Sequence, residues 1–530
     1  MREFEIVLGL VFAATLLQPI ARRLDVPLAI AQVFGGILLS AIPFFPTVPF
    51  DPELTFVLFV PPLLYRAAST SSLRDTRRNA RPILLLAVAL VLVTIAVVAA
   101  VAHSFSPKIP WTAAFVLAAI VAPSDADVTT QIVRRLGLPA RLVTILEGET
   151  LLNDTTAFVS YRMAVRAAAV GAFSVAWAAS TFIGATIGGL IIGLAIGWLL
   201  RKLREHVADS VAVSTLSLAT PFAAYLLAEA IGASGVLAVV AAGAVASRTP
   251  LRKVSARTRI RLNVMWDTIT FAVGALVFTL IGLQIGRLIP GFLSEGALGL
   301  VVAVFVISAA VVGTRIVWLF PAAYVPRLLS KRLRARDPIP PWRALIVLGW
   351  AGLRGGDTLV MALAVPTQTA SGAAFPARDI VVTVAFGVIL LTLLVQGFTL
   401  RPMIKWFDLP RGDATDAEER RARLEAQQAA IKTLEEIGGQ GHIPANALAQ
   451  MQAAIAQRTQ LDLDDTDHSA GHTGLTLEDA IRDAEQQVRD ASREALARLR
   501  DEEEIGDAAF SRVLSDLDLD EVRNVDEPIT

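Results

Sequence analysis

The 530-residue chain contains no cysteine. It therefore has no disulfide framework, no thiolate zinc site, no cysteine nucleophile and no cysteine-bound iron–sulfur cluster. It is also poor in charge, since Asp, Glu, Lys and Arg make up 18% of its residues and the formal net charge is +0. A soluble multidomain chain carries more charge than this, so the 54% of hydrophobic residues indicates a membrane protein with several spans.

The zero net charge hides an uneven distribution. Residues 1–400 carry 33 Lys and Arg against 19 Asp and Glu, whereas residues 401–530 carry 15 against 29. The basic residues lie between apolar runs, where they are typical of a topology signal and not of a nucleic-acid-binding surface. No nucleophile–base arrangement is recognisable, so we expect no nucleic-acid partner, no enzyme activity and no cofactor.

Long apolar runs dominate the first 400 residues. A window of roughly 19 residues finds about 13 stretches near the ~20 residues that cross ~30 Å of hydrocarbon. The expected spans are 4–20, 26–46, 53–66, 82–102, 111–124, 142–165, 179–200, 211–230, 234–247, 264–285, 298–322, 344–366 and 380–400. The sequence therefore predicts an all-α polytopic membrane protein.

The loops between these spans differ in charge. About 25 cations lie in the connections that follow the odd-numbered spans, against roughly six in the other connections. Because basic loops stay on the cytoplasmic side, we expect a multi-pass protein of the plasma (inner) membrane. Its N-terminus would lie outside and its C-terminus in the cytoplasm.

From about residue 408 the chain becomes polar, acidic and rich in helix formers, which predicts a cytosolic tail. We expect helices at 417–437, 444–458 and 475–499. The acidic stretch 500–530 is expected to be partly disordered. A regulatory role and a purely structural role for this tail are equally open.

Ionisable residues inside the spans are the strongest functional signal, because a charge at the bilayer centre costs at least ~2.5–3.5 kcal/mol. They gather in four places: Pro123-Ser124-Asp125-Ala126-Asp127 at the end of span 5, Leu146–Asp154 at the start of span 6, Arg315 in span 11, and Gly352–Asp357 in span 12.

Two of these places contain helix breakers. Pro123 removes a backbone donor, and the glycines of span 12 lower helix propensity by roughly 1 kcal/mol each. Span 12 lies an odd number of spans after span 5 and so crosses in the opposite direction, as in an inverted-topology repeat. Broken helices at membrane depth indicate a midplane ion or substrate site. For each break alone, close helix packing or an ordinary kink is the simpler alternative.

The spacing on span 6 predicts two faces. Glu149 and Asn153 are four residues apart and share a helix face, whereas Asp154 points roughly 140° away. We expect Arg315 to pair with Glu149 and Asn153, and Asp154 to face a water-filled crevice. A carboxylate there holds either a proton or a monovalent cation, which is the chemistry of a cation–proton antiporter.

Four motifs resemble the monovalent cation–proton antiporter family, that is, bacterial sodium–proton antiporters related to the mammalian sodium–proton exchangers. LEGETLLND at 146–154 is similar to the family's EGESLLND signature on the ion-binding helix. Gly352-Leu353-Arg354-Gly355 resembles GLRGA, Pro61-Pro62-Leu63-Leu64 resembles LPPLLF, and VQGFTLRP at 395–402 resembles the VQGxTxRP ending of the final span. The resemblance covers about residues 5–405.

The resemblance implies a fold with inverted repeats and two crossing, unwound helices, and it implies roles for individual residues. The cation and the proton would bind at Asp154, Asn153, Asp125 and Ser124, with Asp154 and Asp125 as the Na⁺ ligands. Glu149 and Arg315 would form a stabilising salt bridge. The unwound segments would contain Pro123, Gly352, Arg354, Gly355 and Gly356.

Three further acids have no assigned role. Asp127 and Asp357 replace residues that are apolar in the family pattern, and Glu147 lies inside the signature. If Asp127 and Asp357 reach the crevice, ion choice and stoichiometry change. An alternative function therefore stays open, namely a transport-incompetent cation or pH sensor that signals through the tail.

The family resemblance also implies electroneutral exchange of a monovalent cation, first of all Na⁺, for H⁺. Alternating access would use an elevator-like motion of a core domain in a homodimer, and small-residue runs such as 241–244 suit a dimer interface. We expect an antiporter domain at 1–407 and the tail at 408–530. The antiporter domain would comprise core spans at about 82–165 and 298–400, dimerisation spans at about 4–66 and 211–285, and a linker span at about 179–200.

Overall fold

The structure is a computed structural model, and apart from one isolated β-bridge, between Gln368 and Ala374, its regular elements are helices wherever the chain is described. It describes residues 2–24, 26–42, 52–105, 109–125, 129–130, 133, 140–170, 175–207, 209–247, 255–292, 298–337, 339–369, 372–407, 413–439 and 475–526. The chain divides into two compact units, residues 1–248 with 265–411 and residues 249–264 with 412–530.

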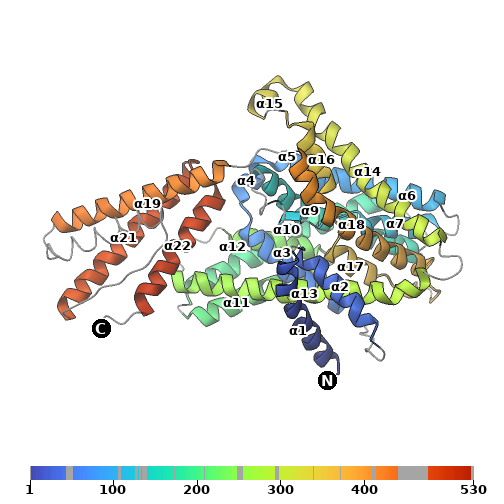
Figure 1. The fold of residues 1–530 in the computed structure, drawn as a ribbon, viewed down its shortest axis with the longest axis horizontal. Coiled ribbons are helices and arrows are strands. Elements are labelled where there is room, and N and C mark those ends of the chain that lie inside the picture. Colours follow the sequence, from blue (N-terminus) through green and yellow to red (C-terminus); the bar gives the residue numbers. More distant parts are fainter. Residues whose placement is uncertain are drawn as a thin grey trace. The chain divides into compact units, whose positions relative to one another are not determined.

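The helices of the first unit follow the expected spans in order (Figure 1). They are α1 (Arg2–Arg23), α2 (Leu28–Ser40), α3 (Pro52–Thr70), α4 (Leu73–Arg78), α5 (Ala80–Leu84), the π-helical turn η1 (Leu85–Leu90), α6 (Val91–Phe105), α7 (Trp111–Val121), α9 (Ala140–Val170), α10 (Val175–Glu205), α11 (Ser210–Ala230), α12 (Gly235–Ala246), α13 (Ala256–Phe292), α14 (Leu298–Leu329), α15 (Lys331–Arg336), α16 (Trp342–Trp350), α17 (Gly356–Leu363) and α18 (Arg378–Phe407).

Each expected span falls on one or more of these helices. The span 82–102 is covered by α5, η1 and α6 together, and the span 344–366 is covered by α16 and α17. Among the described residues, six segments are long and apolar enough to cross a membrane: Ala80–Phe105, Ser180–Glu205, Ser210–Ala230, Ala256–Gly286, Leu298–Leu329 and Arg378–Phe407. The chain is thus an all-helical membrane protein.

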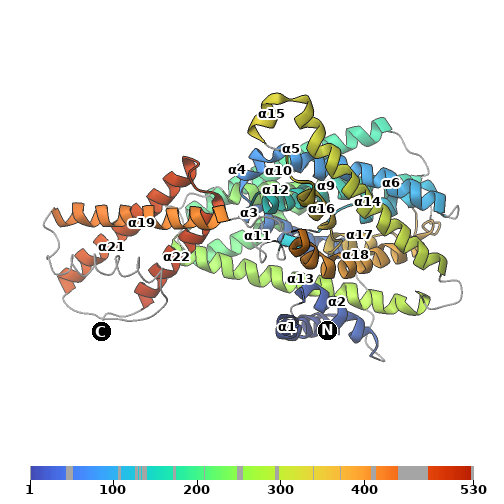
Figure 2. The same ribbon diagram turned by 45° about the horizontal axis from the view of Figure 1, so that its top comes forward.

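The helix that carries the signature, α9, packs against α7, the π-helical turn η1 and α5. Helix α7 also packs against α6 and α18, and Figure 2 shows α6, α14 and α18 running past one another. Their contact faces consist of small and β-branched residues, for example Ala113, Ala114 and Val116 of α7, which are completely buried. Small side chains allow the close helix approach that is common in membrane proteins.

Glycines on α10 bring this helix against α12. Gly189, Gly193 and Gly197 are spaced four residues apart, and a Cβ at Gly197 would come within 2.9 Å of the Ala242 Cα. On the other side of α12, a Cβ at Gly243 would lie 2.8 Å from the Ala68 Cβ of α3. The small residues 241–243 are therefore buried within the protomer, where they allow close packing between helices.

The second unit contains three tail helices that lie side by side (Figure 1). They are α19 (Asp413–Gly439), α21 (Leu475–Asp501) and α22 (Asp507–Asp526). The expected helices 417–437 and 475–499 fall on α19 and α21, and the expected helix 444–458 lies outside the described residues. Within the stretch 500–530, which was expected to be partly disordered, residues 507–526 form α22, and its Phe510 and Val513 are buried in the tail core.

Candidate functional site

The first broken segment follows α7, which ends at Val121. The next residues are Ala122, Pro123, Ser124 and Asp125, and they are not helical. Proline lacks the N–H that the next helical hydrogen bond requires, and its ring clashes with the preceding turn. The helix therefore stops in an apolar environment, and the carbonyl groups of its last turn need other donors.

The second broken segment separates α16 from α17 and comprises residues 351–355. Glycine is required at two positions for lack of space. A Cβ at Gly352 would lie 2.6 Å from the Arg315 side chain, and a Cβ at Gly355 would collide with the Asp125 carboxyl group. These glycines allow an arginine and an aspartate to lie directly against the main chain.

The two broken segments are hydrogen-bonded to each other. The Asp125 N–H donates to the Leu353 carbonyl at 2.8 Å, and the Gly356 N–H donates to Oδ2 of Asp125 at 3.2 Å. The Thr129 hydroxyl donates to the Ala351 carbonyl at 2.7 Å. Backbone groups released from the helices are thus satisfied across the crossing, as burial demands.

Arg354 completes this crossing. Its guanidinium donates to the carbonyl oxygens of Val121 at 2.9 Å, of Ala122 at 3.2 Å, and of Gly352. The first two carbonyls belong to the interrupted end of α7. A fully buried arginine therefore acts here as a cap for the broken helix, with its charge spread over main-chain oxygens.

A buried ion pair joins α9 to α14. Both terminal nitrogens of Arg315 contact the Glu149 carboxylate, with 2.8 Å between Nη2 and Oε2, and the side chains are 3% and 2% exposed. The Ser124 hydroxyl lies between them, donating to Glu149 at 3.0 Å and accepting from Arg315 at 3.2 Å. The structure thus brings together the two residues that the sequence analysis paired.

Asn153 lies on the same face but has a different partner from the expected one. Its Nδ2 donates to the carbonyl and to the hydroxyl oxygen of Ser124, both at 3.1 Å. No hydrogen bond from Arg315 to Asn153 exists in the described part of the chain, so that expectation is wrong. The reason is geometric, because Ser124 occupies the space between the arginine and the amide.

Asp154 is 1% exposed, so the expectation that it faces an open water-filled crevice is wrong for this conformation. Asp357, in the first turn of α17, lies close enough to Asp154 for the two side chains to interact electrostatically. Asp125 is the other acid whose charge acts on Asp357. Asp357, which the sequence left without a role, is therefore brought to the site.

The other two acids without an assigned role are Asp127 and Glu147, and Asp127 lies outside the described residues. Glu147 is half-buried, and its position two residues before Glu149 turns it roughly 200° around α9. Over the described ranges, no group of three or more acidic or histidine side chains is close enough to hold a metal ion.

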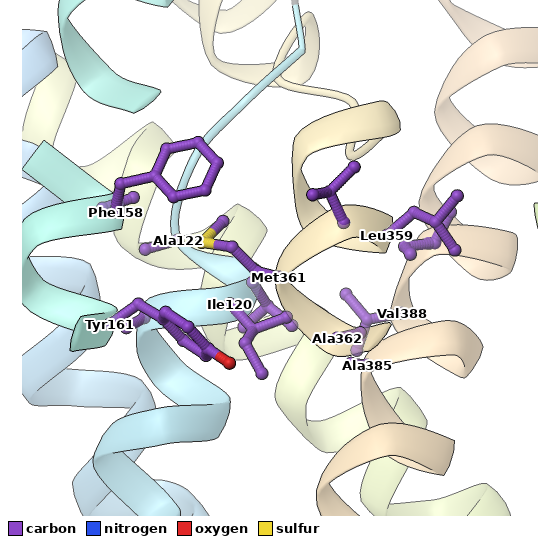
Figure 3. Close-up of a cluster of buried hydrophobic side chains, with 14 of the residues drawn as sticks. Ile120, Ala122, Phe158, Tyr161, Leu359, Met361, Ala362, Ala385 and Val388 are labelled. Carbon is purple, nitrogen blue, oxygen red and sulfur yellow. The ribbon is translucent and has the colours of Figure 1, made fainter. Parts of the chain in front are cut away.

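Apolar side chains line one side of the site (Figure 3). Phe158 and Tyr161 of α9 face Met361 of α17, with Ile120 and Ala122 at the end of α7 between them. Phe158 is four residues beyond Asp154, and Met361 is four beyond Asp357, so each is about one helical turn from an acid. An ion at the acids would meet a buried apolar wall in this direction.

Thr129 is a site residue that sequence reasoning missed. Its hydroxyl is completely buried and reaches a carbonyl 222 residues further along the chain. The available signal was the polar pair Thr129-Thr130 at the end of a span, which resembles an ordinary helix end in the sequence. Only the crossing of the two broken segments gives this hydroxyl its role.

Comparisons with known proteins agree with this geometry. Residues 9–406 match the family described as "Sodium/hydrogen exchanger, transmembrane". An uncharacterized Na(+)/H(+) exchanger of Mycobacterium tuberculosis is 31% identical over 525 residues, which cover 98% of this chain and 96% of that protein. A sodium, potassium, lithium and rubidium/H(+) antiporter of Bacillus pumilus is 32% identical over 423 residues, covering 78% of this chain and 62% of that protein.

The fold also resembles a solved structure, that of the sodium proton antiporter MjNhaP1 from Methanocaldococcus jannaschii at pH 8. The TM-score is 0.59 at 16% sequence identity, and the match covers 76% of this chain and 98% of that one. The family match, the relative that covers nearly the whole chain and the fold all indicate the same family. The chain therefore belongs to the transmembrane sodium/hydrogen exchanger family and is a membrane-embedded monovalent cation/proton antiporter, not an enzyme.

Proposed function

We propose that the protein exchanges Na⁺ for H⁺ at Asp154, one ion for one proton. The observation that carries this proposal is the convergence of Asp154, Asn153 and the Ser124-Asp125 segment at the point where two broken segments cross. A carboxylate in such a place binds one positive charge at a time, because a second one has no compensating partner. Competition between cation and proton then couples the two fluxes.

The oxygen atoms around Asp154 support a hard monovalent cation as the substrate. Oδ1 of the buried Asn153 accepts no hydrogen bond within the described ranges, so it can turn to an ion. Carboxylate, amide and carbonyl oxygens are the ligands that hard cations prefer. The name of the Bacillus pumilus relative includes sodium, potassium and lithium, so K⁺ and Li⁺ are the alternatives to Na⁺.

One-for-one exchange is supported by the neutral residue beside Asp154. Asn153 contributes an amide where a second acid would bring another titrating charge, and its donor group is engaged with Ser124. Glu149 is neutralised by Arg315 and does not carry a proton across. The exchange is then electroneutral, since Na⁺ and H⁺ replace each other with the same charge.

The proposed transport cycle is alternating access with an elevator-like motion. The two broken segments would be the crossing, unwound helices of an inverted repeat, and their mutual hydrogen bonds would make the core spans move as one block. The buried state of Asp154 and the apolar wall of Phe158 and Met361 support an occluded ion site that opens by movement of whole helices.

The topology, the membrane location and the homodimer that we propose rest on the loop charges and on the family resemblance. Basic loops after the odd-numbered spans place the C-terminal tail in the cytoplasm and the protein in the plasma (inner) membrane. Division into core, linker and dimerisation spans, and the homodimer itself, are carried over from the family resemblance.

The experiment uses proton flux in inverted membrane vesicles, followed with a pH-sensitive dye. Addition of Na⁺ should release the proton gradient in vesicles that contain the wild-type protein. Asp154→Asn keeps the size of the side chain but cannot exchange a proton, so it should abolish the response to Na⁺, K⁺ and Li⁺ at every pH.

The matched control is Asp379→Asn, because the Asp379 side chain is 100% exposed at the start of α18. This variant should behave like the wild type. An Asp154→Asn protein that is well expressed and still exchanges Na⁺ would refute the proposal.

A further inference from the structure

Three arginines from separate segments of the first unit approach one another. They are Arg81 of α5, Arg141 at the start of α9 and Arg327 at the end of α14. All three belong to connections that follow odd-numbered spans, so the order of the spans places them at the same surface of the membrane. Figures 1 and 2 both show α5 beside α15, the short helix that follows α14.

A single aspartate joins two of these arginines. Asp337, which follows α15, pairs through Oδ2 with Nη2 of Arg327 and through Oδ1 with Nη2 of Arg141, each at 2.7 Å. The Nε of Arg327 also donates to the Asp337 carbonyl at 3.1 Å. Each carboxylate oxygen of Asp337 therefore already faces one arginine.

Arg81 is the third arginine and lacks such a partner. Arg141 donates through Nε to Oδ1 of Asn79 at 3.1 Å, and this contact and the packing of α5 on α9 hold Arg81 close to the other two. Their charges and that of Asp337 act on Arg81. The Nε of Arg81 is nevertheless buried without a hydrogen-bond acceptor, and its guanidinium forms no ion pair with a residue that the structure describes.

The three arginines and one aspartate leave an excess of two positive charges. Like charges that lie close together repel one another, and a buried N–H without an acceptor adds a desolvation cost. An anion with several oxygen atoms removes both costs. A phosphate group fits best, because its oxygens match the planar fork of donors that a guanidinium presents.

Aromatic side chains indicate that the arginines lie at the level of lipid headgroups. Trp342 begins α16 five residues after Asp337, is 50% exposed and lies with its ring 5.6 Å from that of Phe407. Trp406, which also contacts Phe407, is 80% exposed. Tryptophan is enriched at the membrane–water interface, so this end of α16 and α18 is expected to lie there.

The flanking helices add exposed positive charge to the same surface. Helices α4 and α15 carry the exposed residues Arg77, Arg78, Lys331 and Arg332. Basic pockets between transmembrane helices are typical binding places for anionic lipid headgroups. Both the aromatic residues and the charges thus favour a lipid over a soluble anion as the source of the phosphate.

We propose that Arg81, Arg141 and Arg327 form a binding site for a phosphate group, supplied by the headgroup of an anionic phospholipid. Arg81 contributes the donors that have no acceptor within the described part of the chain. Asp337 keeps the other two arginines in place and is itself neutralised by them. The lipid joins α5, α9 and α14 at the membrane surface and thereby stabilises the first unit.

A purely structural role of Arg81 predicts a different behaviour of the lipid-free protein. If no anion is bound, Arg81 contributes repulsion, so Arg81→Gln should leave the melting temperature unchanged or raise it slightly. The matched control is Arg77→Gln on the preceding helix α4. It removes the same charge from the same surface, at an exposed position.

The experiment measures the melting temperature of the full-length protein in a neutral detergent during titration with dioctanoyl phosphatidylglycerol. Dioctanoyl phosphatidylcholine and inorganic phosphate are titrated in parallel. We expect only phosphatidylglycerol to raise the melting temperature of the wild type, because it binds the folded state. In Arg81→Gln the lipid concentration for the half-maximal shift should rise roughly 10-fold, as for the loss of one charge-assisted hydrogen bond. Arg77→Gln should respond like the wild type.

Equal losses in Arg81→Gln and Arg77→Gln would indicate general attraction by surface charge and overturn the site, as would a wild type that does not respond to phosphatidylglycerol. An equal response to inorganic phosphate that Arg81→Gln abolishes would support the phosphate site and overturn the lipid as its source. A much lower melting temperature of lipid-free Arg81→Gln would reveal a structural partner and overturn the inference. These measurements do not involve transport, so they are independent of the proposed exchange at Asp154.

Discussion

Arg315 and Arg354 show how two buried arginines in one site can have different tasks. Arg315 neutralises a carboxylate, whereas Arg354 donates to carbonyl oxygens that a broken helix has left without donors. The first arrangement is sensitive to the loss of either partner, because the remaining charge stays buried. The acceptors of Arg354 are main-chain carbonyl oxygens, and these remain in place when neighbouring side chains are substituted.

The Glu149–Arg315 pair yields a stability prediction. Arg315→Ala leaves Glu149 charged and 2% exposed, which typically costs ~3–5 kcal/mol. We expect a clearly lower melting temperature of the detergent-solubilised protein and lower expression. Substitution of both residues, as Glu149→Gln with Arg315→Gln, should recover part of the loss.

The control for this prediction is the pair of Arg421 and Glu504, because both side chains are exposed, at 55% and 36%. Exposed pairs contribute about 0–1 kcal/mol, so Arg421→Ala should barely change the melting temperature. An Arg315→Ala protein that melts like the wild type would show that the pair does not stabilise the fold.

At the scale of single residues, the sequence predicts which residues belong to the candidate site better than it predicts their contacts. The spacing of Glu149, Asn153 and Asp154 predicts their two faces, and an arginine alone in an apolar span predicts a buried partner. The intervening Ser124, the capping of α7 by Arg354 and the approach of Asp357 to Asp154 are not predictable, because each depends on how two distant broken segments cross.

At the scale of the elements, the tail helices illustrate how an acidic segment folds. Asp518 of α22 is bound by Arg493 of α21 at 2.9 Å and by Arg259 at the start of α13, and its side chain is 4% exposed. An acidic residue of this segment is thus paired with arginines from other helices. The composition of 500–530 predicted disorder because it does not reveal these partners.

Glu419 of α19 gives the tail a pH dependence. Burial would raise the pKa of its carboxyl group, but hydrogen bonds from Arg512 at 2.8 Å and Arg423 at 3.0 Å outweigh this and hold the pKa below its usual value. A lowered pKa in the folded state means that the contribution to stability is present near neutral pH. It is lost as the pH falls below about 4, through the folded-state pKa.

We therefore expect α19 and α22 to separate more easily in acid. The chain has no cysteine, so Leu424→Cys and Leu519→Cys, both at exposed positions, can carry two spin labels. The distance distribution between the labels should broaden below about pH 4. With Glu419→Gln it should already be broader at neutral pH and change less on acidification; an unchanged pH response in this variant would contradict the assignment.

At the scale of the whole molecule, the two units correspond to two candidate functions. The proposed ion site lies within the first unit, since Ser124, Asn153, Asp154 and Asp125 all belong to it. Deletion of residues 412–530 should therefore leave cation–proton exchange in proteoliposomes at a substantial fraction of the wild-type rate. Complete loss of exchange in a well-folded truncated protein would contradict this prediction and show that transport depends on the tail.

The division of the chain could be predicted from the sequence only in part. Apolar runs predict the helices of the first unit, because the length of a membrane span is fixed by the bilayer. That residues 249–264 belong with the tail unit was not predictable, since this depends on contacts such as the one between Arg259 and Asp518. Contacts between residues far apart in the sequence cannot be predicted from local composition.

The crossing of the two broken segments has a consequence for how such a protein can diversify. Its central hydrogen bond, from the Asp125 N–H to the Leu353 carbonyl, uses main-chain atoms only. Mutation can therefore exchange side chains beside this contact, for example at position 153, without removing the main-chain hydrogen bond that joins the two segments. Ion preference becomes an evolvable trait on an inherited scaffold, and selection can retune it one substitution at a time.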